Sequence, residues 1–127
     1  MNKVALITGA SSGIGKELAR LHASKGGDLV IVARRENELN DLKAELESDH
    51  GVGVTCISMD LTDPKAPQEL YDAINSQKIE VEYLMNNAGF GGHGRFVERE
   101  WAKDRAMIQL NIVALTELTR LFLPQMV

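Results

Sequence analysis

The stretch Thr8-Gly9-Ala10-Ser11-Ser12-Gly13-Ile14-Gly15 decides the fold class, because it joins a short apolar run directly to a segment with helical spacing. A strand that ends in a tight glycine turn and continues as a helix aims unpaired backbone N–H groups at one place. The positive end of the helix dipole lies at the same place, so the turn can bind an anion such as phosphate. A glycine-rich turn without a ligand is the alternative for this stretch taken alone.

Each glycine between Thr8 and Gly15 has a different expected structural role. Gly9 would form the tight turn, Gly13 would let a pyrophosphate approach the backbone, and Gly15 would let the helix pack close to the sheet. The hydroxyl groups of Ser11 and Ser12 would add hydrogen bonds to the same anion.

Beyond this stretch, short β-branched apolar runs alternate with longer runs of helical spacing, which predicts an α/β fold with a parallel sheet covered on both faces. We expect strands at 3–8, 29–33, 54–59 and 81–85. We expect helices at 14–24, 36–48, 64–76, 97–104 and 106–126, with Asp63 as a cap and Pro64 in the first turn of the third. The 127 residues are predicted to form one domain.

Two other phosphate-binding sites fit the sequence less well. The NTPase loop G-x-x-x-x-G-K-[ST] ends like Gly15-Lys16, but Ala10 replaces its first glycine and Glu17 replaces its Ser/Thr. We therefore interpret Lys16 as a solvated helix residue. A methyltransferase-like or NAD site would place a carboxylate at the end of the second strand to bind ribose, and this position reads Val32-Ala33-Arg34-Arg35.

A guanidinium at the end of the second strand suits a 2'-phosphate, because it offers bidentate charge-assisted bonds and can stack on adenine. This favours NADP(H) over NAD(H), with Arg34 as the stronger candidate and Arg35 beside it. The alternative is that both are ordinary solvated residues before a helix.

These residues together resemble the classical short-chain dehydrogenase/reductase family. The resemblance is carried by Thr8 to Gly15, Asp60-Leu61 after the third strand, Asn86-Asn87-Ala88-Gly89 after the fourth, and Asn111. It spans essentially all of the chain but about half of a doubly wound Rossmann-type domain, which has two βαβαβ halves. The resemblance therefore implies the NADP-binding N-terminal part of such a domain, truncated after four strands and a long interface helix.

The resemblance also assigns roles to residues of the cofactor site. It implies that Ile14 belongs to the cofactor loop, that Asp60 hydrogen-bonds the adenine amino group, and that the Leu61 backbone lines the same pocket. It implies that Asn86 is structural and that 87–89 face the cofactor ribose. Turn chemistry is the alternative for Asp60, although Asp63 is the better helix cap, which would leave Asp60 free for a ligand.

Asn111 lies in an otherwise apolar helical segment, where an amide needs partners. The resemblance implies a catalytic role, in which this asparagine positions a water in a proton relay; a structural asparagine bonded to backbone is the alternative. His93 is interpreted as an exposed loop residue, and Trp101 and Phe96 as packing residues or walls of a substrate loop.

The family reaction moves a hydride between nicotinamide and a carbonyl or alcohol carbon, and it uses a serine and a Tyr-x-x-x-Lys pair. Tyr71 is followed four residues later by Asn75 and Tyr83 by Asn87, so this pair is missing here. Two hypotheses follow: an NADP-dependent oxidoreductase whose 127 residues are inactive alone, or a non-catalytic dinucleotide-binding or interaction module.

Composition and charge limit the partners, metal sites and cellular location that we expect. Net charge is −4 without a basic cluster, which argues against nucleic acid, and the single cysteine, Cys56, allows neither an intramolecular disulfide nor a cysteine metal cage. No metal site is predicted. The run 108–127 is interrupted by polar residues and Pro124, and no signal peptide precedes residue 3, so we expect a cytoplasmic protein without a membrane partner.

The helix expected at 106–126 suggests self-association. Its apolar residues Ile108, Ile112, Leu115, Leu118 and Phe122 are expected to form an exposed face. The matching helix packs in subunit interfaces of the family, so we expect a homo-oligomer formed through it.

Overall fold

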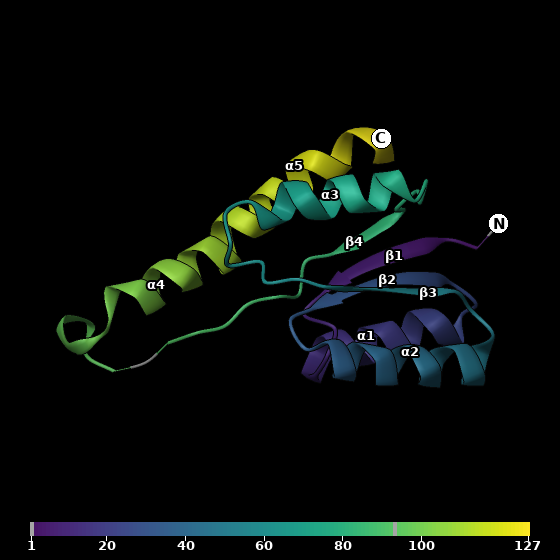
Figure 1. The fold of residues 1–127 in the computed structure, drawn as a ribbon, viewed down its shortest axis with the longest axis horizontal. Helices are drawn as coiled ribbons and strands as arrows, with labels where there is room; N and C mark the ends of the chain where they lie inside the picture. Colours follow the sequence, from purple (N-terminus) through teal and green to yellow (C-terminus); the bar gives the residue numbers. More distant parts are fainter. Residues whose placement is uncertain (1, 93) are drawn as a thin grey trace.

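The computed structural model describes residues 2–92 and 94–127, and it contains a four-stranded parallel sheet with the order β3-β2-β1-β4. The predicted α/β class and Rossmann-type parallel sheet are confirmed (Figure 1). The strands are β1 (Val4–Thr8), β2 (Asp28–Ala33), β3 (Val54–Ser58) and β4 (Tyr83–Met85). The helices are α1 (Gly13–Ser24), α2 (Glu36–His50), α3 (Ala66–Ser76), η1 (Phe96–Glu98), α4 (Trp101–Ile108), η2 (Gln109–Ala114) and α5 (Leu115–Met126).

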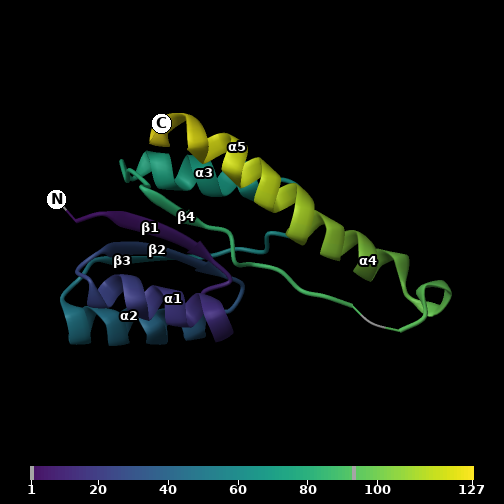
Figure 2. The same cartoon turned by 180° about the vertical axis from the view of Figure 1, so that it is seen from behind.

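Helices cover both faces of the sheet. Helices α1 and α2 lie on one face, and α3 and α5 lie on the other (Figures 1 and 2). Successive strand residues point to opposite faces, so Ile7 packs in the cluster under α1 and α2 while Leu6 packs in the cluster under α3 and α5. This burial on both faces explains why β1 and β2 read as continuous apolar runs.

The carboxyl ends of the four strands point toward one edge of the sheet. The loops that follow β1, β2, β3 and β4 therefore gather at that edge, while both termini lie toward the opposite one (Figure 1). The chain crosses from β3 at one side of the sheet to β4 at the other, so strand order reverses between β1 and β4. This reversal is the place where parallel α/β sheets open a crevice for ligands.

The predicted start of the third helix is wrong. The Asp63 carboxylate accepts a bond from the Lys65 N–H at 2.9 Å, and the Asp63 carbonyl accepts one from Ala66 at 3.0 Å. These bonds close a separate turn, so α3 begins at Ala66 and its early proline is Pro67 rather than Pro64.

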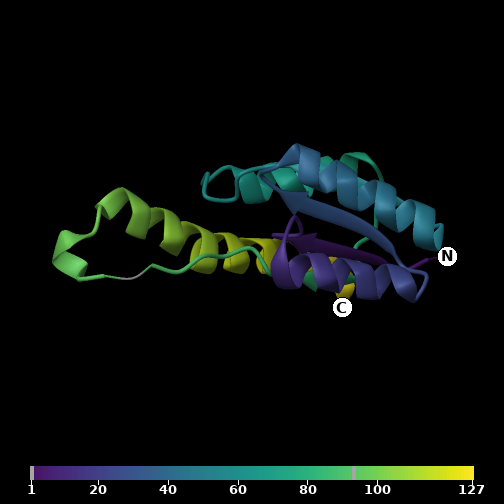
Figure 3. The same ribbon diagram turned by 90° about the horizontal axis from the view of Figure 1, so that it is seen from below.

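Two helices predicted at 97–104 and 106–126 are also placed differently. A short 3-10 turn, η1, is followed by one continuous helical stretch from Trp101 to Met126, in which the π-helical turn η2 joins α4 to α5. No glycine or proline interrupts the stretch before Pro124 in the last turn. The first part of this stretch, α4 and η2, forms with the loop after β4 an arm that projects beyond the sheet (Figure 3), whereas α5 packs beside α3.

The apolar face expected on the last helix is only partly exposed. Leu118 and Phe122 are buried in the core, and the Phe122 ring meets Tyr71 of α3 edge-on at 5.0 Å between centroids. Ile108, Ile112 and Leu115 remain exposed, at 40%, 58% and 38%. Since 118 and 122 are four residues apart, they share the face of α5 that packs on the sheet.

By length and composition alone, the helix Trp101–Met126 could cross a membrane: its most apolar 18 residues have a mean hydropathy of 1.3, and 17% of them are buried. The sequence led us to expect no such helix, because polar residues and Pro124 interrupt the run 108–127. Within this helix, Leu118 and Phe122 are buried in the core.

Candidate functional site

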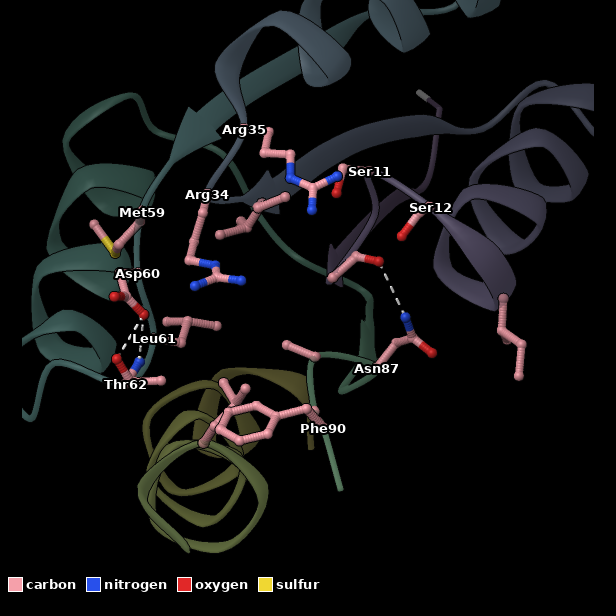
Figure 4. A pocket seen from close by; sticks show the side chains of 17 residues that line it. Ser11, Ser12, Arg34, Arg35, Met59, Asp60, Leu61, Thr62, Asn87 and Phe90 are labelled. Carbon is pink, nitrogen blue, oxygen red and sulfur yellow. Dashed lines mark hydrogen bonds between the residues drawn. The ribbon is translucent and has the colours of Figure 1, made fainter. Parts of the chain in front are cut away.

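A cavity of about 430 Å³ opens at the carboxyl edge of the sheet, with walls from the loops after all four strands (Figure 4). All predicted cofactor residues except Gly13 and Gly15 line it, namely Gly9, Ser11, Ser12, Ile14, Arg34, Arg35, Asp60, Leu61, Asn87, Ala88 and Gly89. Six further lining residues were not predicted: Val32, Ala33, Met59, Thr62, Phe90 and Leu110. Predicted residues up to 80 positions apart in sequence are thus brought into one cleft.

The glycines of the first turn allow close approach of backbone segments. Gly9 has φ +66°, and a Cβ there would meet the Ala88 Cα at 2.9 Å. A Cβ at Gly15 would overlap the Gly9 carbonyl and the Asn87 amide, so the start of α1 packs directly against the turn. Gly13 has φ +58° with nothing within 4 Å of an added Cβ, which leaves its backbone open to an approaching group.

Thr8 ties the two sides of the cavity together, a role that the sequence reasoning missed. The residue is 2% exposed, and its hydroxyl oxygen accepts N–H bonds from Asn87 at 3.0 Å and Ala88 at 2.9 Å. The Asn87 amide in turn donates to the Gly9 carbonyl at 3.1 Å. A polar residue closing a buried strand was the available signal, because such a hydroxyl requires partners.

The two arginines after β2 differ in their partners. Arg35 donates to Glu38 at 3.0 Å, whereas Arg34 forms no ion pair with the residues that the structure describes. The Ser58 hydroxyl donates to the Arg34 carbonyl at 2.9 Å and so attaches its backbone to the end of β3. The Arg34 guanidinium points into the cavity between Asp60 and the loop after β1 (Figure 4).

Asp60 makes local bonds through one carboxylate oxygen, which is the turn chemistry that the sequence offered as an alternative. One carboxylate oxygen accepts the Thr62 hydroxyl at 2.7 Å and the Thr62 N–H at 2.9 Å. Chiefly these two bonds, with a smaller contribution from the positive charge of Arg34, hold the pKa of Asp60 below its usual range. Asp60 is therefore an anion in a preformed turn, and the neighbouring Leu61 is buried beside it.

Asn111 lies outside the cavity lining and is bonded to backbone. Its side-chain oxygen accepts the Phe90 N–H at 3.0 Å, and its amide donates to the Phe90 carbonyl at 2.6 Å. This is the geometry of the structural alternative, since both ends of the amide are engaged. Asn86 donates to Thr119 at 3.1 Å and does not line the cavity, whereas His93 lies outside the described residues.

The lining groups suit binding more than proton transfer. Backbone N–H groups at the start of α1, two serines and two guanidiniums can hold phosphates, and apolar walls such as Val32 and Leu61 can hold a flat ring. Among the described lining residues there is no tyrosine, lysine or histidine. Nor do the described residues contain a group of His, Cys, Asp and Glu that could hold a metal ion.

Comparisons with known proteins agree with this geometry. Residues 3–127 match the family described as short chain dehydrogenase. Dehydrogenase/reductase SDR family member 7B of Bos taurus is 33% identical over 99% of this chain and 40% of its own length. NADP-dependent 3-hydroxy acid dehydrogenase of Schizosaccharomyces pombe is 32% identical over 96% of this chain and 48% of its own.

Solved structures show the same likeness in three dimensions. The crystal structure of L-sorbose reductase from Gluconobacter frateurii, complexed with NADPH and L-sorbose, superimposes with a TM-score of 0.91 at 32% identity. The match covers 98% of this chain and 48% of that one. The chain thus spans about half or less of the length of these relatives.

Proposed function

The chain belongs to the short-chain dehydrogenase/reductase family of oxidoreductases, and we propose that its cavity binds NADP(H). In the whole protein the bound nicotinamide supplies hydride exchange with a carbonyl or alcohol carbon of a small-molecule substrate. The observation that carries the cofactor proposal is Arg34, a guanidinium free of ion pairs among the described residues, aimed into the cavity where an NAD site has a carboxylate.

The residues present fit such a cofactor from one end of the cavity to the other. The adenine with its 2'-phosphate belongs beside Arg34, Asp60 and Leu61, which follow β2 and β3. The pyrophosphate belongs at the start of α1, where backbone N–H groups and the Ser11 and Ser12 hydroxyls converge. The Ser12 side chain makes no capping bond to α1, so its hydroxyl can serve a ligand.

The remaining proposals concern the residues after β4, Asn111, and the location and oligomeric state of the protein. Residues 87–89 are proposed to contact ribose, and Ile14 is proposed to contact the cofactor from the loop after β1. For Asn111 we propose that its contribution includes holding the Phe90 backbone, in addition to the water-positioning role implied by the family. Cytoplasmic location and a homo-oligomer formed through the 106–126 helix stay proposals.

We propose that these 127 residues bind cofactor without turning over substrate, since the lining offers no proton donor of the required kind. The non-catalytic alternative gains no support from the relatives, whose names are those of reductases and dehydrogenases. A complete active site would need a serine and a Tyr-x-x-x-Lys pair supplied outside this stretch.

Calorimetric titration with NADPH and then NADH tests the proposal, after circular dichroism has shown that the 127-residue chain is folded. We expect saturable binding that favours NADPH. A folded chain that binds neither nucleotide would refute the cofactor proposal and favour an interaction module. Equal affinity for both would leave a dinucleotide site but remove the 2'-phosphate assignment of Arg34.

A further inference from the structure

The loop after β4 is attached to the helical arm at two points. Asn111 holds Phe90 through both backbone groups, at 3.0 and 2.6 Å. Two residues further along the loop, a Cβ added to Gly92 would overlap the guanidinium of Arg99. The head of the Arg99 side chain therefore lies directly against the Gly92 backbone.

Asp104 holds Arg99 in this position. The Arg99 Nε donates to Asp104 Oδ1 at 2.7 Å, and a second guanidinium nitrogen contacts the same oxygen. Their side chains are 18% and 9% exposed, whereas both side chains of every other ion pair among the described residues are at least 36% exposed. A shielded pair loses hydration on both ions, so it persists only where its geometry is good and its further bonds are satisfied.

The spacing in the helix explains how both attachments serve one loop. Asp104 and Asn111 are seven residues apart, about two helical turns, and so lie on nearly the same face of the arm. The loop after β4 runs beside the arm in all three ribbon views (Figures 1 to 3). Phe90, at the attachment nearer the sheet, lines the cofactor cavity and also a groove of about 640 Å³ between this loop and the start of α4.

We propose that Arg99 and Asp104 are positioning residues of the cavity: they hold Gly92 against α4 and, with Asn111, keep Phe90 in place as a wall. That the ligand beside Phe90 is a cofactor rests on the function proposed above, but the attachment of the loop to Arg99 and Asp104 does not. Arginine suits the task because its planar guanidinium can lie flat on a glycine backbone while it binds a carboxylate. An aspartate that merely complemented the dipole at the start of α4 would need no buried partner.

Hydrogen exchange of the chain without ligand tests the attachment. In Arg99→Gln, we expect the Phe90 amide, which donates to Asn111, to exchange about tenfold faster, because the charged hydrogen bond that holds the neighbouring Gly92 is lost. Gly92→Ala should give the same result by displacing the guanidinium, and the two changes together should add little. Arg95→Gln is the matched control, since it breaks the exposed pair with Glu98 at 3.5 Å in the same region.

The amides of β1 distinguish positioning from general stability. They should exchange alike in all four variants. Unchanged exchange of the Phe90 amide in Arg99→Gln, or equal acceleration in β1, would overturn the proposal.

Cofactor binding supplies a second measurement, because Trp101 is the only tryptophan and lies at the start of the arm. Energy transfer from Trp101 to saturating NADPH should fall in Arg99→Gln and recover in part in Arg99→Lys, which keeps the charge but not the planar group. Unchanged transfer at saturation would also overturn the role in shaping the cavity. Failure of the wild-type chain to bind NADPH would instead refute the cofactor proposal, while the exchange result would still decide the attachment.

Discussion

Replacing Arg34 by glutamine should weaken NADPH binding strongly and NADH binding hardly at all. The change removes the one positive charge in the cavity that has no ion pair among the described residues, and it keeps a side chain of similar length. NADH lacks the 2'-phosphate, so the deleted guanidinium has no phosphate partner there to lose.

The magnitude follows from the exposure and partners of Arg34. Its side chain is exposed at the cavity mouth, so its bonds to a phosphate are partly screened by water. A hydrogen bond to a charged group contributes about 1.5–3 kcal/mol, which corresponds to a loss of roughly 10- to 100-fold in affinity. Arg34→Asp should lose more, because a carboxylate repels the phosphate.

Arg35→Gln is the matched control, since Arg35 already binds Glu38 and is exposed. Its loss of NADPH affinity should be about fivefold or less. Calorimetry or fluorescence titration at a fixed ionic strength measures both nucleotides for each variant. Equal losses of NADPH and NADH in Arg34→Gln, or a larger NADPH loss in the Arg35 control, would refute the assignment of Arg34 to the 2'-phosphate.

Three further outcomes test the scaffold of the site. Thr8→Val should lower the free energy of unfolding in urea by about 2–4 kcal/mol, because two N–H groups lose their buried acceptor. Thr8→Ser keeps the hydroxyl and should retain most of the wild-type free energy of unfolding. Equal values for the two variants would contradict this reasoning. The lowered pKa of Asp60 means that its bonds stabilise the folded chain above the usual value of 3.8, and that this contribution is lost as pH falls through the folded value. Thr62→Val should therefore raise the pKa of Asp60 in an NMR titration, and an unchanged value would show that the hydroxyl bond is not its cause. If the wild-type chain is a dimer in analytical ultracentrifugation, Ile112→Glu should make it a monomer without changing its free energy of unfolding. A wild-type chain that is already monomeric at micromolar concentration would contradict the proposed oligomer.

The local parts of this fold could be predicted from the sequence. The conformation of the turn from Thr8 to Gly15 is determined locally, because its glycines allow the tight backbone turn and the following segment has helical spacing. Continuous apolar runs predicted strands buried on both faces, and Ala33-Arg34 predicted a basic group at the end of β2. Each of these inferences depended on neighbours in the chain.

The parts that were missed depend on contacts between distant residues. Nothing near Asn111 shows that its amide would bind Phe90, 21 positions earlier, and nothing near Thr8 shows that it would accept bonds from the loop after β4. Asp60 was expected to be free because Asp63 was the better cap, yet each carboxylate closes its own turn. Burial of Leu118 and Phe122 likewise required knowing that α5 packs against α3.

Strand order explains why a chain that spans about half the length of its relatives contains both strands that flank the crevice. The crevice opens between β1 and β4, where the strand order reverses, and both strands belong to this chain. The Thr8 hydroxyl joins their loops with two N–H bonds, and the Asn87 amide adds a third bond to Gly9. Both walls are therefore fixed by contacts within the described residues, so we expect the proposed cofactor affinity to depend on this crevice.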